Sequence, residues 1–328
     1  MLSDVLNPDL FASAIRMATP LALAAIGGTI CERSGVVNIA LEGMMLIGAF
    51  FGTAATLALQ GTAVGPLGAV WIGLIAAVAS GALFSLIHAF ASIDLRMEQV
   101  VSGTALNILA LGMTGFLMEA FYGHPGSTDA VRQTLPQVFN FPAAAANAGI
   151  LGTIWTWINT LLFSYTPIAY MAIAIAIIGQ WALYNTRWGV RLRALGEHPR
   201  AADTVGINVR RGRYAAVVIS GALGGLAGAN LALEQVGTFT ENMSNGRGFI
   251  ALAANIFGRW TPVGSYLASL LFGFTDALQI KFQLVSSTIK VPPQLFLMLP
   301  YVLTVVVLAG VMGRAVVPAA VGKPYEKE

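Results

Sequence analysis

Ionisable and amide side chains that interrupt long apolar runs are the residues of this chain best suited to bind a polar solute. In an apolar setting such a group is costly, so each one needs a hydrogen-bonding partner or a polar path to face. Asparagine amides are able to donate to sugar hydroxyls or to base edges. The candidates for such a path are Asn38, Glu42, Asn107, Asn230, Asn255 and Asp276.

Each candidate also has a structural interpretation. Glu42 is the first choice for the path, in even competition with a structural hydrogen bond to a neighbouring helix, and it is expected to share a helix face with Asn38, four residues earlier. Asparagines within spans more often join helices than bind solutes. Asp276 has Lys281 within snorkelling reach, so a local ion pair competes with a role in the path.

The composition is that of an integral membrane protein. Hydrophobic residues make up 56% of the 328 residues and charged residues only 10%, whereas about a quarter of a soluble domain is charged. The mean hydropathy of +0.74 agrees. A net charge of +3 is too small to indicate nucleic-acid binding. The single cysteine, Cys31, excludes an intrachain disulfide, and the three scattered histidines form no metal-ligand pattern.

Eight apolar segments are long enough to cross a membrane as helices, at about 20 residues each. Two further apolar pieces, 149–163 and 248–257, are too short, so each is interfacial, re-entrant or half of a broken helix. The prediction is an all-α polytopic membrane protein with ten helical segments in one domain, residues 1–328. The eight full spans are 10–30, 36–59, 67–93, 100–121, 167–186, 214–233, 263–280 and 294–313.

Positive charge sets the orientation, because short cationic loops resist translocation. Seven of the 18 Lys and Arg residues lie between Arg187 and Arg213, so the loop 187–213 is expected in the cytoplasm. The count over the C-terminal half also favours a cytoplasmic C-terminus. Upstream the charges balance, and the side of the N-terminus stays undecided.

A short helix is predicted within that loop, in "EHPRAADTVG". Pro199 suits the first helical position, and Asp203 is the acid near the start. Gly206 suits the residue just past the end. A loop that served topology alone would need the arginines but no capped helix, so this helix is interpreted as a docking element framed by basic flanks.

Glycines mark where helices approach closely. The segment "SGALGGLAGAN" contains two overlapping pairs of glycines spaced four apart, a spacing that favours tight helix packing. The expected packing residues are Gly221, Gly224, Gly225 and Gly228.

Three segments resemble a known family. "RALGEHPRAADTVGIN" resembles the coupling loop of ABC importer permeases, although its spacing departs from the older Glu-Ala-Ala signature. "ERSGVVNIALEGMMLIGAF" and "GRGFIALAANIFGRWTPVGSYLASLLFGFTDALQ" are similar to the N- and C-terminal signatures of permeases for simple sugars and nucleosides, within the group that also carries branched-chain amino acids and ribose. On this resemblance, the residues that couple to the ATPase are Glu197, Pro199, Ala201, Ala202, Asp203 and Gly206.

The resemblance implies a type II importer-like permease in the cell inner membrane, which moves a nucleoside or simple sugar by alternating access. It implies as partners a cytoplasmic ATPase, a second and different permease, and an extracytoplasmic substrate-binding protein. It also implies that the chain is not an enzyme and binds no cofactor, and that ATP and Mg bind to the ATPase. Consistent with this, the chain contains no G-x-x-x-x-G-K-[ST] motif with which to hold ATP.

Two other function classes compete with this interpretation. An ion-coupled secondary transporter would carry its proton on intramembrane carboxylates such as Glu42 or Asp276. An intramembrane enzyme is disfavoured, since the spans carry no catalytic triad, dyad or metal cluster. One further hypothesis concerns interrupted helices, which in repeat-built transporters surround the central site. It predicts that segments 38–45 and 247–258 flank the pore.

Overall fold

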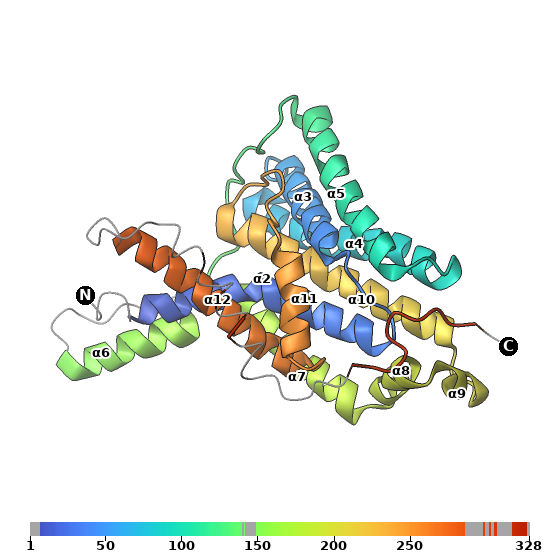
Figure 1. Cartoon of the computed structure of the whole chain (residues 1–328). Coiled ribbons are helices and arrows are strands. Elements are labelled where there is room, and N and C mark those ends of the chain that lie inside the picture. Colours follow the sequence, from blue (N-terminus) through green and yellow to red (C-terminus); the bar gives the residue numbers. More distant parts are fainter. Residues whose placement is uncertain are drawn as a thin grey trace.

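The computed structural model describes a bundle of helices (Figure 1). The described residues are 7–139, 141, 149–285, 298, 302, 305–306 and 317–326. Within them no β-strand forms, and the only β-type pairing is an isolated bridge between Ser127 and Thr240. The prediction of an all-α polytopic membrane protein is therefore confirmed. The last expected span, 294–313, lies almost wholly outside the described residues.

Seven helices are long and apolar enough to cross a membrane. They correspond to the first seven expected spans. Two of them continue into π-helical turns, η1 (Phe90–Asp94) and η3 (Asn230–Val236). The seven are α2 (Pro8–Arg33), α3 (Leu41–Leu59), α4 (Gly65–Ala89), α5 (Gln99–Tyr122), α7 (Pro167–Asn185), α10 (Val209–Ala229) and α12 (Pro262–Val285).

The first short apolar piece forms α6 (Gly149–Ile158) and the π-helical turn η2 (Asn159–Phe163). The amide of Val138, before this piece, donates to the carbonyl of Tyr165, after it, at 3.1 Å. The residues on either side of this piece therefore lie next to each other. Trp157 packs against Phe11 at the start of α2, with ring centroids 6.0 Å apart.

The second short piece forms α11 (Arg247–Phe257), which packs against α2, α3 and α12. Beyond it, Arg259 and Trp260 accept hydrogen bonds through their carbonyls from the guanidinium of Arg33, at the end of α2. The chain then turns into α12. Thus α11 ends at the level where α2 ends.

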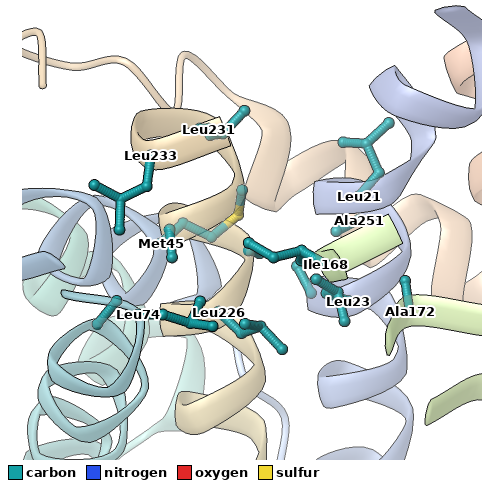
Figure 2. Close-up of a cluster of buried hydrophobic side chains, with 14 of the residues drawn as sticks. Leu21, Leu23, Met45, Leu74, Ile168, Ala172, Leu226, Leu231, Leu233 and Ala251 are labelled. Atoms are coloured by element: carbon teal, nitrogen blue, oxygen red, sulfur yellow. The ribbon is translucent and has the colours of Figure 1, made fainter. Parts of the chain in front are cut away.

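The helix α2 lies in the centre of the bundle, and its residues from Ala18 to Glu32 are all buried. Figure 2 shows the largest apolar cluster, to which α2, α3, α4, α7, α10, η3 and α11 all contribute. Between helices in a membrane, close packing rather than exclusion of water stabilises such contacts. Labelled members are Leu21, Leu23, Met45, Leu74, Ile168, Ala172, Leu226, Leu231, Leu233 and Ala251.

The glycines of α10 lie where this helix crosses α3 and α4. A Cβ atom on Gly225 would be 2.1 Å from the carbonyl oxygen of Ala77 in α4, and one on Gly228 would be 2.0 Å from that of Met45 in α3. Gly221 and Gly224 face the same two helices. Any side chain at Gly225 or Gly228 would force the helices apart.

The two ends of the bundle carry different segments (Figure 1). At one end lie α8 (Arg187–Glu197), α9 (Pro199–Thr204) and the C-terminal tail, residues 317–326; at the other, α2 begins beside α6. The first span therefore begins at the end of the bundle opposite the arginine-rich loop.

Candidate functional site

Glu42 joins the beginnings of two helices. Its Oε1 accepts a hydrogen bond from the amide of Gly246 at 2.7 Å, and its Oε2 accepts one from the amide of Gly248 at 2.6 Å. Both amides belong to the N-terminus of α11, where backbone N–H groups have no partner within the helix. A Cβ atom on Gly248 would lie 2.4 Å from the Glu42 nitrogen, so only glycine permits this approach.

Asn107 of α5 fixes the start of α3 from the other side. Its Nδ2 donates to the carbonyl of Ile39 at 2.9 Å, and its Oδ1 accepts from the amide of Gly43 at 2.8 Å. One side chain therefore satisfies both a carbonyl before α3 and an amide within its first turn. Segments 38–45 and 247–258, expected to flank the pore, thus meet at Glu42, with α5 beside them.

A pocket of about 270 Å³ opens beside Glu42 and Asn107. Its walls come from α3, α5, the start of α11 and the non-helical loop before α11. The lining residues are Glu42, Gly43, Leu46, Thr104, Asn107, Ile108, Leu111, Asn242, Ser244, Asn245, Gly246 and Phe249. Sequence reasoning missed the polar members of this loop, because they occur between two apolar pieces and resemble an ordinary connection.

Asn38 lies apart from this pocket. Its Nδ2 donates to Ser220 Oγ of α10 at 2.8 Å. The expectation that Asn38 and Glu42 share a helix face is wrong, since α3 begins only at Leu41 and residues 36–38 form no regular secondary structure. Side chains from outside satisfy the backbone of this unwound stretch: the Val37 amide donates to Gln99 Oε1, the Val37 carbonyl contacts His88 Nε2, and Asn107 bonds the Ile39 carbonyl.

Asn255 belongs to a second buried cluster, between α2, α11 and α12. Its Oδ1 accepts from Thr29 Oγ1 at 2.7 Å, and Thr29 also contacts Ser265 Oγ at 2.7 Å. In the same region Glu32 accepts a hydrogen bond from the indole of Trp260. Glu32 was missed because it precedes Arg33 and resembles a headgroup residue, yet it is buried.

Asn230 and Asp276 lie outside both clusters. Asn230 accepts from Gln235 Nε2 at 2.8 Å, within η3. Asp276 is half-buried on α12, with Arg247 as the cation whose charge acts on it. The alternative of an ion pair with Lys281 is not found, because no salt bridge joins these two described residues.

Arg247 itself lines a second pocket, of about 460 Å³, on the other side of the loop before α11. Asn242 and Asn245 contribute to both pockets. The loop before α11 therefore has two accessible flanks.

The predicted short helix in the arginine-rich loop is present as α9, with Pro199 at its first position and Gly206 at a φ of +83° just beyond it. Sequence analysis missed α8, since the arginines before Gly196 were assigned to a flank and form a helix instead. Ala202 points inward against Leu195 and Val209. Ala201 points outward.

The C-terminal tail covers part of this loop. The amide of Ala319 donates to Glu197 Oε2 at 3.2 Å, and that of Ala320 donates to the carbonyl of Gly196 at 2.8 Å. Desolvation raises the pKa of the Tyr325 phenol, and the hydrogen bond to the Asp203 carboxylate raises it further. Glu197 is therefore already engaged within the chain.

Known proteins resemble this chain over nearly its full length. The family model described as "Branched-chain amino acid transport system / permease component" matches residues 10–308. The chain is 45% identical to the guanosine ABC transporter permease protein NupQ of Bacillus subtilis and 40% identical to the nucleoside ABC transporter permease protein NupC of Lactococcus lactis, each over 94% of both chains.

A second Bacillus subtilis guanosine permease, NupP, is 28% identical over 79% of this chain and 70% of its own length. No solved structure matches the chain.

Proposed function

Because the chain belongs to the family of branched-chain amino acid transport system permease components, we propose that it is the subunit through which an ATP-driven importer moves nucleosides across the inner membrane. The observation that carries the substrate class is the identity of 45% and 40%, over 94% of the chain, to permeases named for guanosine and for nucleosides. As a permease component the chain is not an enzyme, and ATP with Mg would bind to a separate ATPase.

The outward face of α9 is the surface proposed to meet that ATPase. Arg200, Ala201 and Thr204 are exposed there, and the Val205 side chain that follows is 73% exposed. An exposed apolar side chain beside cations suits a protein interface. Of the coupling residues expected from the sequence, Ala202 would anchor α9 to the bundle, while Glu197 would hold the tail and Asp203 would contact Tyr325.

A second permease is proposed as the partner within the membrane. Bacillus subtilis has two guanosine permease proteins, NupQ and NupP, which supports a pair of different chains rather than two copies. A substrate-binding protein on the outer side completes the proposed assembly.

The test is uptake of labelled guanosine into vesicles that contain this chain with its ATPase, second permease and binding protein. We expect uptake that requires ATP and persists when ion gradients are collapsed. Uptake that stops with the gradient while ATP is present would instead indicate the ion-coupled secondary transporter. A complex that hydrolyses ATP but imports only sugars would overturn the substrate class alone.

A further inference from the structure

The loop before α11, Gly237–Gly246, enters the interior of the helical bundle. Phe239 is fully buried and packs edge-on against Phe50 of α3, with ring centroids 5.2 Å apart, and it shares a cluster with Met118 of α5. The loop ends at Gly246, which donates to Glu42 in the first turn of α3. Glu42 and Phe50 are eight residues apart, or about 12 Å along the helix. The loop thus descends between the helices without helical structure.

Non-helical backbone at this depth is tolerated only where protein covers it or where it lines a water-filled cavity. Protein does not cover two residues of this loop. Asn242 and Asn245 are exposed, and both have left-handed backbone conformations, with φ of +56° and +44°. Amide side chains and strained polar backbone in contact with lipid tails would be costly. The exposed side of this loop therefore faces water.

The pocket on this side contains complementary groups for a small neutral solute. Ser244 is 1% exposed, and its hydroxyl has no hydrogen-bond partner. Phe249, one turn into α11, exposes 49% of its side chain at the rim. Glu42 forms the floor, and each of its carboxylate oxygens keeps a lone pair beyond the amide that it accepts.

We propose that this pocket binds the nucleoside during its passage, with the base stacked on Phe249 and sugar hydroxyls hydrogen-bonded to Ser244 and Asn245. Aromatic rings stack on every base, so this contact tolerates different nucleosides. The unpaired Ser244 hydroxyl gains a partner only when a solute is bound. The negative charge of Glu42 repels phosphate, so the pocket accepts nucleosides and rejects nucleotides. This assignment rests on the proposed nucleoside transport.

The chain is suited to a labelling test, because its only cysteine, Cys31, is buried and can be replaced by alanine. In that background Thr104→Cys, at an exposed position of α5 that lines the pocket, is treated with a charged, water-soluble thiol reagent in the assembled transporter. We expect the cysteine to react, and saturating guanosine to slow the reaction at least fivefold. Guanosine 5′-monophosphate should give no protection. The matched control is Val64→Cys, which lies in the exposed connection between α3 and α4 and outside the pocket.

A second measurement uses uptake. Phe249→Ala is expected to lower guanosine uptake about tenfold, Phe249→Tyr to retain it, and Phe116→Ala to leave it unchanged, all with ATP hydrolysis intact. If the unmodified complex imports guanosine but Thr104→Cys reacts equally with and without it, and Phe249→Ala imports normally, the pocket is not the binding site and the proposed function stands. If the unmodified complex imports no nucleoside, both proposals fail.

Discussion

Glu32 accepts a hydrogen bond from the indole N–H of Trp260, and this bond attaches the last turn of α2 to the turn between α11 and α12. Trp260 and its neighbour Arg259 have φ of +53° and +54°, an uncommon conformation for residues other than glycine. Such backbone costs about 1–3 kcal/mol per residue and persists only where the surrounding structure holds it in place. The carboxylate of Glu32 and the guanidinium of Arg33, which donates to the Trp260 carbonyl at 2.7 Å, supply that restraint.

Replacement of Trp260 by phenylalanine should test this restraint. Trp260→Phe keeps an aromatic ring but removes the N–H, so the buried Glu32 carboxylate loses a partner, a loss of about 1–3 kcal/mol. We expect a clearly lower melting temperature of the purified protein in detergent. Trp181→Phe is the control, because Trp181 is 59% exposed on α7. Equal melting temperatures for the two variants would contradict the role given to Trp260.

Replacement of Asn107 should loosen the start of α3. Asn107→Ala leaves the carbonyl of Ile39 and the amide of Gly43 without their partner, and each unsatisfied group costs about 1–3 kcal/mol when buried. Hydrogen exchange should become faster in residues 39–44. Ser80→Ala is the control, because Ser80 bonds only within its own helix, to the carbonyl of Ala77. Unchanged exchange in Asn107→Ala would show that other contacts hold this turn.

A methyl group at Gly225 should prevent correct packing of α10. Gly225→Ala places a carbon 2.1 Å from the Ala77 carbonyl oxygen, whereas nothing lies within 4 Å of a Cβ atom on Gly112. Gly225→Ala is expected to reduce the yield of monodisperse protein severely on size-exclusion chromatography. Gly112→Ala should be neutral or slightly stabilising, because alanine favours a helix over glycine by about 1 kcal/mol. Similar yields would mean that α4 and α10 can separate at no cost.

A charge at Val205 should uncouple transport from ATP hydrolysis. Val205→Asp buries a carboxylate at the proposed ATPase interface, while the fold loses nothing because the side chain is exposed. We expect membrane insertion to be normal and ATP-driven guanosine uptake to fall at least tenfold. Val64→Asp, at an exposed position in the connection between α3 and α4, is the control. Normal uptake by Val205→Asp would exclude this side chain from the interface.

The spans were predictable because their length and apolar composition are local properties of the sequence. The same holds for α9, whose proline and glycine signals are local. Partners distant in sequence were not predictable. Glu42 reaches Gly246 over 204 residues, and no pattern at either position indicates the other. Asn38 was assigned to a helix because its neighbours are apolar. In the structure it precedes the helix, and its side-chain amide donates a hydrogen bond to Ser220.

One signal in the sequence bears on the loop before α11. A piece of only ten apolar residues, 248–257, precedes a full span that begins again at 263. Where such a helix packs inside the bundle, as α11 does against α2, α3 and α12, the segment that leads to it also lies inside. Polar residues in that segment, such as Asn242 and Ser244, are therefore candidates for the path, which a search limited to apolar runs cannot find.

The two restraints on α11 also have a mechanical consequence. Glu42 holds its first turn and Glu32 holds the turn after its end, and the two carboxylates belong to consecutive stretches of one segment, the end of α2 and the start of α3. A short helix that is held at both ends cannot rotate as a rigid body about a single hinge. We therefore expect residues 32–42 and α11 to move together, so that a passage opens and closes at the outer borders of this unit.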